Sequence, residues 1–183
     1  QRLIDVAGSL FYAKGIRAVG VDEVIAEAAV AKATLYRHFP SKEHLVSAYL
    51  EQRSEFALAR LRDSALGSTD PRQQIVDAFR ALDVNLHNPS FRGCAFLLAV
   101  SEHGELASVR RIAERHKASV RDHFVALAAG AGFADTALGD QLTLIYEGAL
   151  ATVVVRPDAE PGRVALDLVT ALLSATLHGE AAR

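Results

Sequence analysis

The sequence predicts an all-α protein of about nine helices. Half of the residues are hydrophobic, and Ala and Leu are the commonest of them. Aromatic residues make up only 7% of the chain and Trp is absent, which favours helix packing over β-sheet packing. Apolar residues recur three and four positions apart between breaks at Gly and Pro, as amphipathic helices require.

Composition also limits the compartment and the class of site. The single cysteine, Cys94, excludes an intrachain disulfide framework and a multi-cysteine zinc site, and it favours a reducing cytoplasm. We find no signal sequence and no apolar stretch of the about 20 residues that a membrane span requires, so we expect a soluble, cytoplasmic protein with no membrane partner. The chain lacks Met and begins with Gln1, so we expect further residues, including an N-terminal arm, to precede it.

The first expected helix ends at Lys14, where Gly15 can supply the C-cap. Its apolar stripe consists of Leu3, Ile4, Ala7, Leu10 and Phe11. This spacing predicts a helix with one buried side.

Two short helices follow at residues 21–28 and 32–39. Gly20 is a weak N-cap for the earlier one, and Pro40 cannot continue the later one. The acidic residues at the positive end of the earlier helix are Asp22 and Glu23. The brief interruption between the two helices predicts a tight turn.

A long fourth helix begins after Ser41, which is a good N-cap. Its apolar side is expected to contain Leu45, Val46, Tyr49, Phe56 and Leu61. Further helices are expected at residues 71–87, 94–103, 105–129, 136–155 and 161–178.

The last two of these helices are apolar on most sides, so most sides must be covered. Two such helices from each of two chains would cover one another in a symmetric four-helix interface. The sequence therefore predicts a homodimer with two interface helices per chain. The alternative is a buried hairpin within a monomer.

A local cluster of cations lies between residues 32 and 44, although the net charge of the chain is −2. The basic and titratable members are Lys32, Arg37, His38, Lys42 and His44, and Glu43 is the acid among them. DNA binding draws much of its affinity from cations and hydroxyls that converge on phosphates, so this stretch is a candidate DNA contact.

Residues 24–43, VIAEAAVAKATLYRHFPSKE, resemble the helix-turn-helix signature of TetR-family regulators. The core from Thr34 to Lys42 carries the resemblance, because its aromatic and basic positions match in register. The resemblance implies a DNA-binding domain at residues 1–45, with the helix-turn-helix at about 20–39. It also implies a ligand-sensing and dimerisation domain at residues 46–183.

Within this motif, Leu35 and Phe39 are four residues apart and are expected to face inward and hold the recognition helix. The DNA-binding residues that the resemblance implies are Lys32, Ala33, Thr34, Tyr36, Arg37, His38 and Lys42. Tyr36 and His38 could instead be half-buried packing residues.

Three alanines depart from the family pattern. Ala29, Ala31 and Ala33 stand where relatives usually carry Gly, Ser and Gly, and Gly20 stands where a Ser or Thr cap is common. Loss of the turn glycine is expected to strain the bend, and loss of the hydroxyls removes possible phosphate contacts.

The family resemblance further implies a homodimer that binds a palindromic double-stranded DNA operator and represses a gene until a small apolar or amphipathic effector binds. The candidate effector residues are Phe79, Leu82, Leu86, Phe96, Val100, His116, Val120, Phe124 and Tyr146, and most of them are more simply explained as core, because pockets are lined by the same apolar residue types. We expect no cofactor, no metal and no catalytic residue, because no catalytic or ligating motif is present. The alternative is a helical small-molecule-binding protein or enzyme with a vestigial helix-turn-helix.

Overall fold

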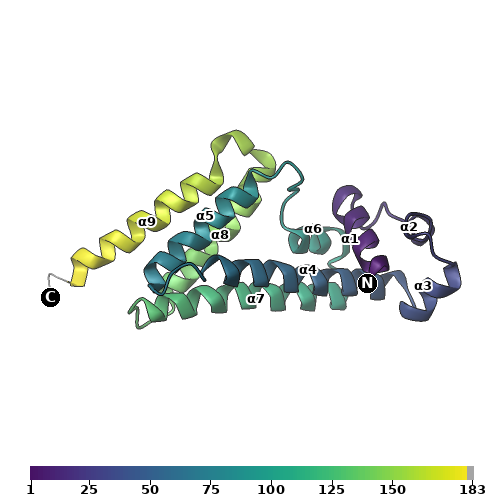
Figure 1. Ribbon diagram of the computed structural model, residues 1–183, viewed down its shortest axis with the longest axis horizontal. Coiled ribbons are helices and arrows are strands. Elements are labelled where there is room, and N and C mark those ends of the chain that lie inside the picture. The colour runs from purple at the N-terminus through teal and green to yellow at the C-terminus, as the bar shows by residue number, and fades with distance from the viewer. Residues whose placement is uncertain (181–183) are drawn as a thin grey trace. The chain divides into compact units, whose positions relative to one another are not determined.

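The computed structural model describes residues 1–180, with side chains to residue 174, and it is all α-helical over that range, as predicted. The helices are α1 (Arg2–Lys14), α2 (Val21–Ala28), α3 (Lys32–His38), α4 (Lys42–Ser64), α5 (Pro71–Leu86), α6 (Ala95–His103), α7 (Ala107–Gly130), α8 (Ala137–Val155) and α9 (Pro161–Glu180), with a 3₁₀ turn, η1 (Pro157–Ala159), before the last (Figure 1). The expected helix boundaries lie within two residues of these bounds.

The chain forms two compact units. The first contains residues 1–56 and 94–116, and the second contains residues 57–93 and those from 117 onward. This grouping differs from the division expected at residue 45, because apolar residues of α6 and of the start of α7 join the same core as α1 to α3. The functional division into a DNA-binding and a sensing domain remains a prediction.

The core of the first unit is built from the inward stripes of the short N-terminal helices. Ala7, Val24, Leu35 and Leu45 are fully buried in it. The ring of Tyr49 meets the ring of Phe11 edge-on, with 5.8 Å between the ring centres. Burial raises the pKa of Tyr49 to about 12, because the charged phenolate is disfavoured away from water.

The turn after α1 is fixed by a glycine and by α6. Gly15 has φ +90°, a conformation that side chains rarely adopt, and its N–H donates to the carbonyl of Phe11 at 2.9 Å. The N–H of Arg17 donates to Glu102 Oε2 at 2.8 Å, and Arg17 Nε donates to the Glu102 carbonyl at 2.7 Å. The turn is thereby attached to the end of α6.

Helices α4 and α7 run in the same direction in the first unit. Ser108 Oγ donates to Glu43 Oε1 at 2.6 Å, and further along both helices Arg115 pairs with Glu51. Farther still, Ser54 Oγ lies 2.9 Å from His116 Nδ1. From one contact to the next, the residue numbers increase in both helices, so α4 and α7 are parallel.

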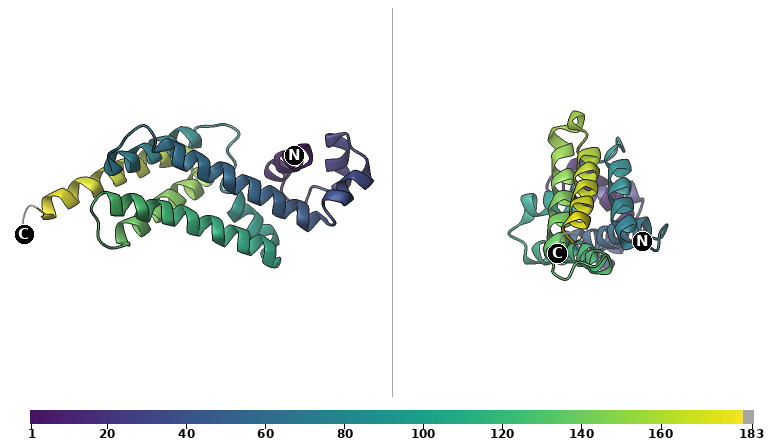
Figure 2. Two further views of the ribbon diagram at one scale, coloured as in Figure 1. Left: turned by 60° about the horizontal axis from the view of Figure 1, so that its bottom comes forward. Right: turned by 90° about the vertical axis from the view of Figure 1, so that its left-hand side faces the viewer.

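The second unit has a separate core with three aromatic rings at its centre. The ring of Phe79 lies 5.5 Å from that of Phe124 and 6.0 Å from that of Tyr146, between ring centres. Gly139 lets α8 approach α7, since a Cβ at this position would lie 2.6 Å from the Cα of Val125. Helix α9 packs against α5 and α8, and the right-hand view of Figure 2 shows α8 and α9 side by side.

Ala29, at the end of α2, has the left-handed conformation with φ +51°. We predict that Ala29→Gly raises the urea midpoint of unfolding. A left-handed conformation costs an L-residue about 1–2 kcal/mol, whereas the added chain entropy of glycine opposes this by about 0.5–1 kcal/mol. Circular dichroism during urea unfolding measures the difference.

The matched control is Ala33→Gly, the other alanine at a position where relatives carry glycine. Ala33 lies inside α3, so glycine there is expected to lower the midpoint, by up to about 1 kcal/mol in stability. Equal losses in both variants would show that the turn conformation of Ala29 stores no strain.

Candidate nucleic-acid interface

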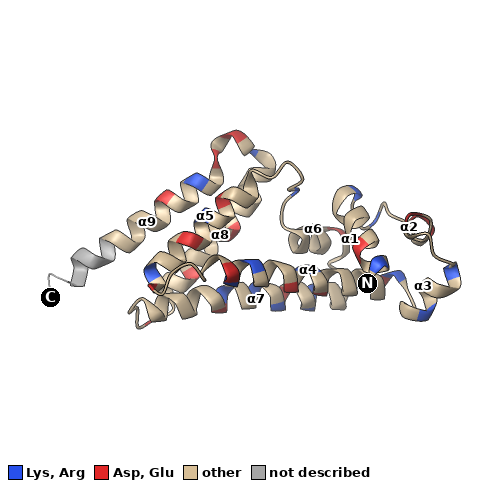
Figure 3. Ribbon diagram, viewed as in Figure 1, with Lys and Arg blue, Asp and Glu red and all other residues tan. Residues whose placement is uncertain are grey.

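Helix α3 presents one buried side and one polar side. Leu35 is fully buried, and Phe39, which follows the helix, is half-buried and packs against the same core. The exposed residues of α3 are Lys32, Ala33, Tyr36, Arg37 and His38. Figure 3 shows Lys and Arg positions on α3 and acidic positions on α2. The inward direction expected for Leu35 is confirmed.

The turn between α2 and α3 is closed by backbone hydrogen bonds. The N–H of Ala29 donates to the carbonyl of Ala26 at 3.1 Å, and the N–H of Val30 donates to that of Ile25 at 3.3 Å. Helix α3 then begins with the carbonyl of Ala31 as acceptor, without a side-chain cap. The alanines thus keep the geometry of the turn but supply no hydroxyl.

The cations of this surface differ in their partners. Lys32 Nζ donates to Asp22 Oδ1 at 2.9 Å, and this hydrogen bond raises the pKa of Lys32. Lys14 pairs with Glu23 in the same way at 2.6 Å. Arg37 makes no ion pair with any residue that the structure describes. It is therefore available to an outside anion or acceptor.

Lys42 is the first residue of α4 and is half-buried. Burial lowers the pKa of Lys42, and the nearby charge of Glu102 opposes the shift. Ser41 precedes it, with its Oγ 3.4 Å from the N–H nitrogen of His44 and 2.8 Å from His44 Nδ1. The side chain of Lys42 is therefore partly packed against the protein.

The structure brings the predicted DNA-binding residues together on α3 and at the start of α4. Thr34 and Lys42 are half-buried, and the remaining members are exposed. Tyr36 has 42% of its surface exposed, so it is more accessible than a packing residue would be. The surface combines cations, a phenol and a threonine methyl, which suit phosphates and base edges. The role of each residue remains a prediction.

The predicted effector residues are divided between the two units. Phe96, Val100 and His116 belong to the first, where the rings of Phe96 and His116 stack with 3.8 Å between their centres. The members in the second unit are Phe79, Leu82, Leu86, Val120, Phe124 and Tyr146. Most of the set is buried within the two cores. Their part in effector binding stays a prediction.

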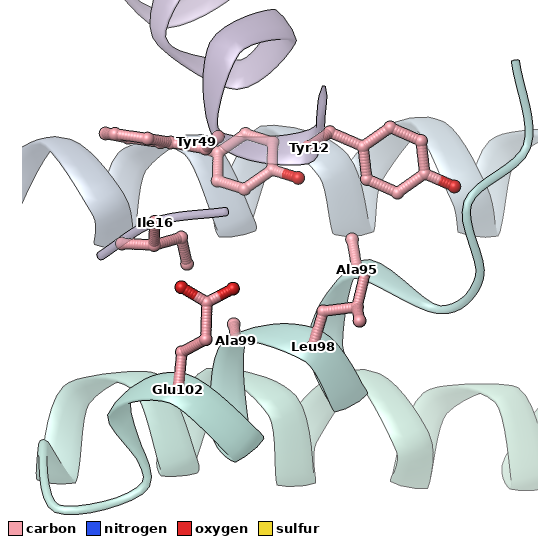
Figure 4. A pocket seen from close by; sticks show the side chains of 8 residues that line it. Tyr12, Ile16, Tyr49, Ala95, Leu98, Ala99 and Glu102 are labelled. Atoms are coloured by element: carbon pink, nitrogen blue, oxygen red, sulfur yellow. The ribbon is translucent and has the colours of Figure 1, made fainter. Parts of the chain in front are cut away.

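A small cavity lies between α1, α4 and α6, and Figure 4 shows it with the carboxylate of Glu102 directed from α6 toward Ile16. Its volume is about 10 Å³, enough for one water molecule. The lining residues are Phe11, Tyr12, Ile16, Tyr49, Ala95, Leu98, Ala99 and Glu102. Sequence patterns gave no sign of this cavity, because its lining comes from three separated segments.

Within the described part of the chain, no group of three or more His, Cys, Asp or Glu residues could hold a metal ion.

Known proteins resemble both the N-terminal part of this chain and nearly its whole length. The model of the bacterial regulatory proteins of the tetR family matches residues 3–49, which include α2, α3 and all but the first residue of α1. Over nearly the whole chain, the structure resembles that of SCO4454, a TetR-family transcriptional regulator from Streptomyces coelicolor. The two share 32% sequence identity with a TM-score of 0.85, over 95% of this chain and 93% of that one.

Two curated regulators match less than half of this chain. The transcriptional activator FasR of Mycolicibacterium smegmatis is 34% identical over 80 residues, and the transcriptional repressor KstR2 of Mycobacterium tuberculosis is 30% identical over 79 residues. These matches span 44% and 43% of this chain but only 36% and 40% of the two regulators. With the helix-turn-helix geometry and the full-length likeness to SCO4454, they show that the chain belongs to the TetR family of transcriptional regulators.

Proposed function

We propose that the protein is a cytoplasmic, homodimeric repressor that binds a near-palindromic DNA operator and releases it when a small effector binds. The observation that carries the proposal is α3, which is anchored by the buried Leu35 and exposes Lys32, Arg37 and His38. Family membership supports a regulatory rather than an enzymatic role.

The proposed docking places α3 in the major groove, with α2 across the sugar-phosphate backbone. Arg37 has no ionic partner among the described residues, so it can address a guanine edge at little cost. Lys42 is the first residue of α4, where we propose that its ammonium binds a DNA phosphate. Two such surfaces, about 34–36 Å apart or a multiple of it, would read the two half-sites.

The proposed dimer interface is the apolar outer side of α8 and α9. Its exposed members include Leu144, Val154, Val155, Val164 and Leu168. Helix α8 is long and apolar enough to cross a membrane by length and composition alone, but only 22% of its apolar window is buried in the structure, so most of that window is left for a partner to cover. In a DNA-binding family, a second copy is the cover that also supplies the second half-site.

The proposed effector is small and apolar or amphipathic, because the candidate residues in both cores are aromatic and aliphatic. It would act by favouring a spacing of the two recognition helices that does not fit DNA. A repressor function is supported by the likeness to KstR2, whereas FasR is an activator, so a reporter gene must settle the sign.

The decisive experiment is a mobility-shift titration with the DNA that flanks the protein's own gene, against a scrambled duplex. A sequence-selective shift that weakens with salt supports the proposal. The alternative, a small-molecule-binding protein or enzyme with a vestigial helix-turn-helix, predicts no selective shift at any salt concentration.

We predict different consequences for two cations of the interface. Lys42→Ala should weaken binding equally for all sequences and lower the slope of log K against log salt by roughly one. Arg37→Ala should cost ~1–3 kcal/mol at one base position and relax selectivity there. Fluorescence anisotropy with singly substituted duplexes checks both, and a uniform loss from Arg37→Ala would make Arg37 a phosphate contact.

We predict that Leu168→Glu, on the exposed side of α9, separates the dimer. The wild-type protein should have twice the chain mass of 19.6 kDa in analytical ultracentrifugation, and the variant should have the single-chain mass. Leu66→Glu is the matched control, because Leu66 is 78% exposed but lies outside α8 and α9. A wild-type protein that sediments as a monomer contradicts the proposed interface.

A further inference from the structure

Asp22 contacts the surface proposed to bind DNA but has the wrong charge for a phosphate contact. We infer that Asp22 sets the selectivity of DNA binding by holding the ammonium of Lys32 in an ion pair that a base edge replaces more readily than a phosphate does. The inference rests on the proposed function, because it assumes that α3 enters the major groove.

The pair joins the first turns of the two helices of the motif. Asp22 lies in the first turn of α2 and Lys32 is the first residue of α3, and the Nζ to Oδ1 distance is 2.9 Å. The side chains of Lys32 and Asp22 are 62% and 82% exposed. The pair is thus open to solvent and to any DNA that α3 approaches.

An exposed ion pair is weak, so a better partner can replace it. The Asp22 carboxylate lies at hydrogen-bonding distance from the Lys32 ammonium. A phosphate that approaches this ammonium therefore also approaches the carboxylate, and the two anions repel each other. The O6 and N7 acceptors of guanine carry no net charge, so the carboxylate does not repel them in this way. Asp22 therefore disfavours phosphate binding by Lys32 more than it disfavours base contact.

The same helical turn contains a matched control. Glu23 has the same charge as Asp22 and also pairs with a lysine, but that lysine is Lys14 of α1, outside the recognition helix. Asp22→Asn and Glu23→Gln remove one negative charge each. A difference in DNA binding between the two variants therefore comes from the lysine that each acid pairs with, and not from the net charge.

The test compares these variants by fluorescence anisotropy over a range of KCl concentrations. The probes are a scrambled duplex and a duplex that the wild-type protein has selected from a random pool. Asp22→Asn should bind the scrambled duplex about fivefold more tightly and should steepen its salt slope by about two per dimer, one for each Lys32 released to a phosphate. Its affinity for the selected duplex should change less, so the selectivity ratio falls.

Two comparisons make the result decisive. In a Lys32→Gln background, Asp22→Asn should no longer change the salt slope, because there is no ammonium to release. Equal effects from Asp22→Asn and Glu23→Gln, or an unchanged selectivity ratio, would overturn the inference while leaving the proposed function intact. A wild-type protein that selects no duplex from the pool would instead overturn the proposed function, and this inference with it.

Discussion

The burial of Leu35 is the contact on which the surface proposed to bind DNA depends. Helix α3 has only seven residues, which is too short for a helix to be stable alone in water. Leu35 is its fully buried residue, in the same core as Val24 and Leu45. The direction of each polar side chain on α3 therefore follows from this one insertion. Everything that we propose for Arg37 or Lys32 assumes that it holds.

Acidic residues close to the cations reduce the positive charge that this surface offers to DNA. The chain has a net charge of −2, and the lysines at positions 14 and 32 are paired with α2. Lys42 is partly desolvated, which leaves Arg37 and His38 as the exposed basic residues of α3 that have no ion pair among the described residues. A surface of this kind offers few unpaired charges to phosphates in general, so contacts with base edges must supply more of its discrimination.

The sequence predicted what local patterns determine and missed what packing determines. Helix bounds and the inward Leu35 follow from apolar spacing, and the strained turn at Ala29 follows from a missing glycine. Phe56 was expected on the buried side of α4 but is 59% exposed, because after Leu50 the helix leaves one core for the other. Asp22 was explained by the helix dipole alone, since its partner lies ten residues away across the turn.

The grouping of α6 and the start of α7 with the N-terminal helices bears on how an effector could act. These segments share a core with α1 to α3, and Glu102 of α6 bonds directly to the turn after α1. Ser108 of α7 likewise bonds to Glu43 in the first turn of α4, next to Lys42. The cavity between α1, α4 and α6 holds one water at most, so it is far too small to be the effector site itself. If the proposed effector moves α6 or α7, these hydrogen bonds within one core therefore connect that movement to the turn after α1 and to the start of α4, without any contact between the effector and α3.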